Sequence, residues 1–170
     1  MRIANGKIVT WGQENQILEG YDLLINDGLI SALILASTPR NENEELIDAG
    51  GQLVMPGNIC AHTHYYGAFS RGWGYPGEPA SNFVEILERL WWRLDKALSP
   101  EAVKYSALVC LVDAIKYGTT TLFDHHASPS CIEGSLDIEH DAMVAAGFRG
   151  SICYEVTDRD GKDKALAGIR

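Results

Sequence analysis

The most informative segment of the sequence reads Met55-Pro-Gly-Asn-Ile-Cys-Ala-His-Thr-His64, in which one residue separates two histidines. In a β-strand, residues i and i+2 project from the same face, about 6.6 Å apart along the strand. The imidazoles of His62 and His64 would then point the same way and could bind one metal ion together. On a helix the two side chains would diverge.

The residues before the histidines favour a strand. Apolar side chains occupy most positions from 53 to 61, and we interpret Pro56-Gly57 as a local kink within the run. A near-continuous apolar run is typical of a parallel strand that is buried on both faces. The histidines would lie at the C-terminal end of this strand, where sheets and barrels of parallel strands build their active sites.

The chain after residue 80 alternates helical and strand patterns. Asn82 is expected to cap a helix whose apolar stripe faces the core and consists of Phe83, Leu87, Leu90, Trp91, Leu94 and Leu98. A second helix should begin at Ser99-Pro100-Glu101 and end at Gly118, and a third should span residues 137–147. Strands are expected at 119–124 and 148–156. This order predicts an α/β fold.

Residues 1–51 are predicted to form a small β-domain. Apolar runs at 7–10, 21–25 and 29–35 read as strands, and the turn Asn26-Asp27-Gly28 joins the last two. An Asp-Gly turn between apolar runs is a good hairpin signal, because glycine accepts the positive φ that a tight turn requires.

The composition is that of an ordinary globular protein: 46% of the 170 residues are hydrophobic and 22% are charged. A net charge of −9 argues against nucleic-acid and membrane partners, because both would repel it. The four cysteines form no Cys-x-x-Cys pair, and neither a signal peptide nor an 18-residue apolar run is present. We therefore expect a soluble cytoplasmic protein.

Four segments, in this order, resemble the amidohydrolase superfamily of metal-dependent hydrolases: Ile25-Asn-Asp-Gly-Leu-Ile30, Ile47-Asp-Ala-Gly-Gly-Gln-Leu-Val-Met-Pro-Gly57, Ala61-His-Thr-His64 and Gly118-Thr-Thr-Thr121. The continuation Tyr65-Tyr-Gly-Ala-Phe-Ser-Arg-Gly72 is similar to the aminohydrolase and chlorohydrolase branch. Within it, Asp124-His-His-Ala-Ser-Pro129 is most similar to the aminohydrolase linked to selenium metabolism.

The resemblance implies a TIM (β/α)8 barrel preceded by part of a small β-sandwich domain. A complete barrel takes about 250 residues. We therefore expect residues 52–170 to be the first part of a truncated barrel, about three βα units, and residues 1–51 to be the N-terminal part of the composite β-sandwich. The chain would be an N-terminal fragment.

The function that the resemblance implies is hydrolytic deamination of a purine-, pyrimidine- or triazine-like heterocycle by metal-bound hydroxide. The cofactor would be one divalent ion, zinc or iron, with His62 and His64 among its ligands. The catalytic residues are expected beyond Arg170, so this chain alone should be inactive. The substrate would be a small molecule, and the full-length protein could form a homo-oligomer.

Three alternatives remain open. A chlorohydrolase would use the same attack to release chloride. A hydantoinase-like cyclic amidase is disfavoured, because that branch usually has an aspartate where this chain has Cys60. The chain could also be a non-catalytic metal-binding fragment.

Secondary candidates surround the His62/His64 pair. His125 and His126 are candidate substrate-binding residues, but strand alternation sends them to opposite sides, so only one can face the cavity. Trp92 could reach the mouth of the site, Arg71 is expected to pair with an acid, and His140 should be a solvated surface residue. The loop Gly72-Trp-Gly-Tyr-Pro-Gly-Glu-Pro79 either covers substrate or is a simple connector.

Overall fold

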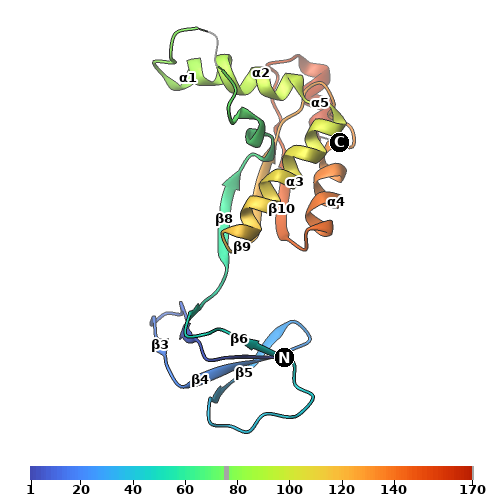
Figure 1. Ribbon diagram of the computed structural model, residues 1–170. Coiled ribbons are helices and arrows are strands. Elements are labelled where there is room, and N and C mark those ends of the chain that lie inside the picture. The colour runs from blue at the N-terminus through green and yellow to red at the C-terminus, as the bar shows by residue number, and fades with distance from the viewer. Residues whose placement is uncertain (75–76, 170) are drawn as a thin grey trace. The chain divides into compact units, whose positions relative to one another are not determined.

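A computed structural model describes residues 1–74 and 77–169, which form two compact units, Met1–Pro56 and Gly57–Arg170 (Figure 1). The first unit contains only strands. The second alternates strands and helices, which confirms the α/β class predicted for this part of the chain. No helix in the described part of the chain is both long and apolar enough to cross a membrane.

The first unit contains two small sheets. One has the order β5-β4-β1-β6 and the other β3-β2-β7. The strands are β1 (Arg2–Ala4), β2 (Lys7–Val9), β3 (Ile17–Leu18), β4 (Tyr21–Asn26), β5 (Leu29–Leu35), β6 (Leu46–Asp48) and β7 (Leu53–Val54). The predicted hairpin is confirmed, because β4 and β5 are antiparallel and both turn residues, Asp27 and Gly28, have positive φ angles of 51° and 76°.

One predicted strand is in fact two. The apolar run from 53 to 61 divides at Pro56: β7 pairs with β2 in the first unit, whereas β8 (Asn58–Thr63) pairs with β9 in the second. Proline has no backbone N–H to donate to a ladder, so the break falls where pairing would otherwise continue. The single kinked strand of the sequence analysis was therefore wrong.

The second unit contains a parallel sheet of order β10-β9-β8, formed by β8, β9 (Thr119–His126) and β10 (Arg149–Tyr154). Helix α3 (Pro100–Lys116) connects β8 to β9, and α4 (Ser135–Ala145) connects β9 to β10. Figure 1 shows α3 and α4 side by side along this sheet. Helix α5 (Lys162–Ile169) follows β10.

The ends of α3 agree with the prediction. The backbone N–H of Ala102 donates to Ser99 Oγ at 3.2 Å, and Pro100 occupies the first turn. Gly118, with a φ of 71°, stops the helix and leads into β9. Local signals thus set both ends of α3, the helix that leads into β9.

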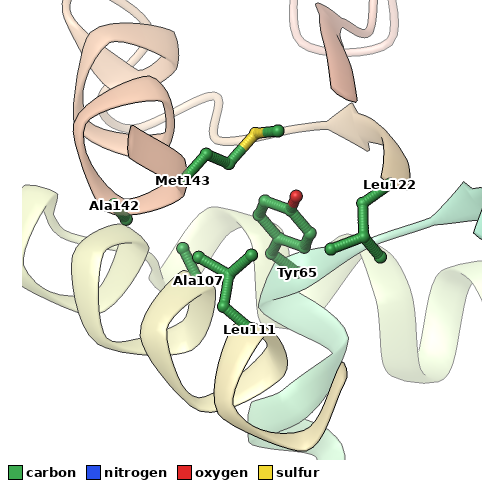
Figure 2. Close-up of a cluster of buried hydrophobic side chains, with 6 residues drawn as sticks. All are labelled: Tyr65, Ala107, Leu111, Leu122, Ala142 and Met143. Carbon is green, nitrogen blue, oxygen red and sulfur yellow. The ribbon is translucent and has the colours of Figure 1, made fainter. Parts of the chain in front are cut away.

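The core of the second unit lies between the sheet and these helices. Figure 2 shows the ring of Tyr65 at the centre of this cluster, beside Leu122 of β9 and the side chains that α3 and α4 contribute. The members are Tyr65, Ala107, Leu111, Leu122, Ala142 and Met143. Burying a large apolar side chain contributes about 1.5–3 kcal/mol, so this layer holds the end of β8 in place.

The opposite face of the sheet is open in this chain. Ile59 and Phe123 are 66% and 43% exposed, and no described helix covers them. The expectation that the first strand is buried on both faces is therefore not met, because α3 and α4 lie on one side only.

The helix predicted from Asn82 is broken into short pieces. Glu85 N–H does donate to Asn82 Oδ1 at 3.0 Å, which confirms the cap. The segments that follow are α1 (Phe83–Ile86), a π-helical turn (Leu87–Trp91), α2 (Trp92–Leu94) and a 3-10 turn (Asp95–Ala97). A π turn inserts an extra residue, which rotates everything after it, so the continuous apolar stripe was wrong: Phe83 is 68% exposed.

Candidate metal centre

His62 and His64 lie side by side at the C-terminal end of β8. Their Nε2 atoms are 3.0 Å apart, and the ring centroids are 4.8 Å apart. The backbone of His64 is extended, with φ −131° and ψ 101°. The geometric expectation is confirmed: both rings occupy one side of an extended segment.

An irregularity in β8 determines which face of the sheet carries the two histidine rings. The pairing of β8 with β9 shifts register between Cys60 and Thr63. Cys60 packs against the buried core, whereas His62, two residues later, is exposed. A regular strand would place both residues on the same face, so the bulge turns the histidines away from the helices.

The tautomer of His64 follows from its second contact. Nδ1 lies 2.6 Å from the carbonyl oxygen of His125, and a carbonyl can only accept, so Nδ1–H is the donor. The lone pair of Nε2 is left facing His62. Burial lowers the pKa of His64, which also favours the neutral imidazole that a metal requires.

The donor set fits a divalent cation. Two nitrogens bound to one tetrahedral metal at about 2.0–2.1 Å lie roughly 3.3 Å apart, so the two Nε2 atoms, 3.0 Å apart at hydrogen-bond distance, would separate by a few tenths of an ångström to bind one ion. A metal-binding histidine usually donates its other ring N–H to a carbonyl or carboxylate, as His64 does here. This pair therefore has the donor atoms and the orientation of two ligands of a metal site.

The two consecutive histidines of β9 take opposite sides, as alternation predicts. The ring of His125 lies 5.5 Å from that of His64, on the side of the pair. His126 is completely buried, and its ring lies 5.8 Å from that of Tyr154. Of these two candidates, only His125 lies beside the His62/His64 pair.

Behind the sheet lies a second group that the sequence analysis missed. Asp124, His126 and Glu139 are each at least 97% buried, and their ligand atoms lie within 4.8 Å of one another. Burial raises the pKa of Asp124 and Glu139 to about 8 and lowers that of His126 to about 4. Burial therefore favours the neutral form of all three groups.

Sequence signals for this group exist. Asp124 precedes His126 by two residues, which places both on one face of a strand. Glu139 stands three and four residues before the buried Ala142 and Met143, so it occupies an apolar position of α4. A carboxylate on the buried face of a helix calls for a partner.

The aromatic residue next to the histidines is Trp91, not Trp92. The Trp91 ring lies 5.6 Å from that of His64 and 5.8 Å from that of Tyr66. Trp92 instead lies under the guanidinium of Arg159, whose Cζ is 5.4 Å from the centroid of the Trp92 ring. The π turn that ends at Trp91 changes the rotation of the two residues, so the expectation for Trp92 was wrong.

The remaining candidates have structural surroundings. Arg71 pairs with Asp113 at 2.5 Å, and His140 is exposed, both as expected. The Gly72–Pro79 loop includes residues 75 and 76, which lie outside the described residues.

Residues 53–168 match the model of the amidohydrolase family. The chain is 33% identical over 154 residues to a 5-methylthioadenosine/S-adenosylhomocysteine deaminase of Syntrophomonas wolfei, covering 89% of this chain and 34% of that protein. It is 28% identical over 147 residues to an 8-oxoguanine deaminase of Pseudomonas aeruginosa, covering 85% and 32%. The chain thus spans about a third of these relatives, 34% of the first.

Solved structures show the same fold. A mutant atrazine chlorohydrolase from Arthrobacter aurescens, complexed with zinc and atraton, gives a TM-score of 0.73 at 22% identity, covering 89% of this chain and 35% of that one. Guanine deaminase from E. coli gives 0.75 at 17% identity, covering 96% and 39%.

Proposed function

Because the chain belongs to the amidohydrolase family, we propose that it forms the first part of a metal-dependent hydrolase that deaminates a heterocyclic small molecule. The observation that carries this proposal is the His62/His64 pair, with Nε2 atoms 3.0 Å apart and the tautomer of His64 fixed by the His125 carbonyl. Relatives named as deaminases of purine derivatives support it.

His62 and His64 would hold one divalent ion, zinc or iron. When bound, such an ion supplies a water that is activated at neutral pH. The residues of this chain do the positioning: the His125 carbonyl keeps Nε2 of His64 unprotonated, and the core under Tyr65 fixes the end of β8. The remaining ligands and the groups that move protons would lie outside this chain.

His125 and Trp91 are the side chains best placed to meet a flat heterocycle. Each ring lies within 5.6 Å of the His64 ring, from a different element. An aromatic ring stacks on a heterocycle, and an imidazole edge can donate to or accept from ring nitrogens. We assign the substrate contact to His125 rather than to the buried His126.

The proposal includes the architecture of the whole protein. Three parallel strands with helices on one face are what the first units of a (β/α)8 barrel would look like. The unit Met1–Pro56 would belong to a composite β-sandwich and Gly57–Arg170 to the barrel, with the boundary after Pro56 rather than after residue 51 because β7 pairs with β2. Closure of the barrel would cover Ile59 and Phe123 on the open face.

Metal binding tests the core of this proposal directly. Titrating cobalt(II) into the metal-free chain should give a visible absorption band that saturates at one ion per chain. His62→Ala and His64→Ala should each weaken binding at least about 10-fold, because each removes one imidazole ligand. The exposed His140 provides the matched control, and His140→Ala should bind as the unaltered chain does. If His62→Ala or His64→Ala bound cobalt(II) as tightly as the unaltered chain does, the assignment would be contradicted.

Activity separates the deaminase from the alternatives. A protein extended through all eight strands should release ammonia from at least one of 5′-methylthioadenosine, guanine and 8-oxoguanine, and should lose this activity in His64→Ala. Release of chloride from a chlorotriazine in place of ammonia would favour the chlorohydrolase, which the atrazine chlorohydrolase fold makes the second candidate. Bound metal without either activity would favour a non-catalytic site.

A further inference from the structure

We propose that Glu139, which lies behind the sheet, is a positioning residue for the metal centre: as a neutral carboxylic acid it donates to His126 and fixes the end of β9, whose His125 carbonyl orients His64. This inference rests on the proposed role of His62 and His64 as metal ligands. It assigns a role to a side chain that does not itself contact the metal site.

The contacts of Ser128 determine which ring nitrogen of His126 carries the proton. Ser128 Oγ donates its only proton to the Cys131 carbonyl oxygen at 3.0 Å. It therefore accepts at its contact with His126 Nε2, 2.9 Å away, so Nε2 carries the imidazole proton. The backbone N–H of Ser128 donates to the Tyr154 hydroxyl, which holds this serine in place.

The tautomer of His126 places a proton on Glu139. With Nε2 protonated, neutral His126 presents a lone pair at Nδ1, and Glu139 Oε1 lies 2.7 Å from it. Two acceptors at that distance repel unless a proton lies between them. Both side chains are completely buried, and neither atom has another assigned hydrogen-bond partner among the described residues. The other acid of the cluster, Asp124, lies beside Glu139, and burial favours its neutral form as well. Burial favours the neutral acid and the neutral imidazole, so the proton belongs to the carboxyl.

A cation is the competing occupant of this cluster. Asp124 Oδ2 and both oxygens of Glu139 are buried without a hydrogen-bond partner, and they could be ligands. The contact between Nδ1 and Oε1, however, is shorter than the roughly 3.3 Å that separates two ligands of a tetrahedral metal. A length of 2.7 Å is that of an ordinary hydrogen bond. The geometry therefore favours a proton.

The cluster is also connected to the metal centre. His125 lies between Asp124 and His126, whose side chains both anchor into the cluster on the far side of the sheet. Asp124 Oδ1 accepts from the Tyr65 backbone N–H at 2.7 Å, one residue after His64. The buried cluster thus fixes the backbone of both partners in the hydrogen bond from His64 Nδ1–H to the His125 carbonyl oxygen.

Two substitutions of Glu139 test the role. Glu139→Gln keeps the shape and places an amide N–H where the acid proton lies, so its cobalt(II) affinity and absorption band should match those of the unaltered chain. Glu139→Met fills a similar volume but offers no donor. It should weaken cobalt(II) binding about 10- to 100-fold and alter the band, as loss of a group that orients a metal ligand does. The exposed Asp141 of the same helix is the control, and Asp141→Ala should change neither.

The outcomes separate the two proposals. Binding that does not depend on His62 and His64 refutes the metal centre itself. Binding that depends on them but is the same in the Glu139→Met protein refutes only the positioning role. Loss of a second metal ion in Glu139→Gln, while the His62-dependent ion stays, would show that the cluster holds a cation.

A measurement on the unaltered chain keeps the proposal testable if Glu139→Met does not fold. Nitrogen-15 NMR of the histidine rings should show His126 neutral, with its proton on Nε2, from pH 6 to 7.5. An imidazolium, or a proton on Nδ1, would overturn the assignment.

Discussion

Arg2 and Asp22 form a buried ion pair in the first unit, with 4% and 2% of their surfaces exposed. Arg2 Nε donates to Asp22 Oδ2 at 2.7 Å, and its other nitrogens donate to the carbonyls of Ala36 and Thr38. Asp22→Ala would remove the hydrogen-bonded counter-ion of a buried guanidinium and leave only Glu44, 4.0 Å away; breaking a buried pair typically costs about 3–5 kcal/mol. We expect a loss of this size in the free energy of unfolding of the first unit, measured by denaturant titration.

The exposed pair of Lys7 and Glu19, with nitrogen and oxygen 3.0 Å apart, is the control in the same unit. Glu19→Ala should cost less than about 1 kcal/mol, because water screens both charges. Similar losses for the two variants would mean that the Arg2 pair is not the buried anchor described here.

Among the elements, β10 is held against β9 at a position where only glycine fits. A Cβ built on Gly150 would lie 2.0 Å from the Leu122 carbonyl oxygen and 2.6 Å from Met143 Cε of α4. Gly150→Ala must therefore move the strand or the helix, and overpacking of this kind typically costs about 1–3 kcal/mol. Thermal unfolding of the second unit should show the loss. Gly74→Ala, where a Cβ meets nothing within 4 Å, should leave stability nearly unchanged.

At the scale of the whole molecule, the buried cluster makes stability depend on pH. The pKa values of Asp124 and Glu139 are about 8 when folded and about 4 when unfolded, so the folded state binds more protons between these values. Stability from these groups is present at low pH and falls as pH rises through this window. His126 acts in the opposite direction, but only between its lowered pKa of about 4 and its ordinary 6.5.

Above pH 6.5 the carboxyl groups therefore dominate. We expect the free energy of unfolding to fall by about 1–3 kcal/mol between pH 6.5 and 8. Each proton that the folded state binds in excess of the unfolded state contributes about 1.4 kcal/mol per pH unit. Denaturant titrations at several pH values would measure it. Glu139→Gln, which cannot titrate, should flatten the slope, and a slope that stays unchanged in this variant would place the titrating groups elsewhere.

Local patterns predicted much of this protein. The hairpin at Asp27-Gly28, the cap at Ser99 and the stop at Gly118 depend on residues close together in the chain, and each appears as expected. The facing pair of His62 and His64 follows from the two-residue period of an extended backbone. These features need no knowledge of distant contacts.

The tertiary structure decided the rest. Whether residues 53–61 make one strand or two depends on which strands they pair with, and β2 and β9 lie in different units. The side of β8 that carries the histidines depends on a bulge set by pairing with β9, and the cluster behind the sheet joins Asp124 to Glu139, a residue of the next helix. Strand pairing and burial are interactions between distant residues, so the periodicity of a single segment does not contain them.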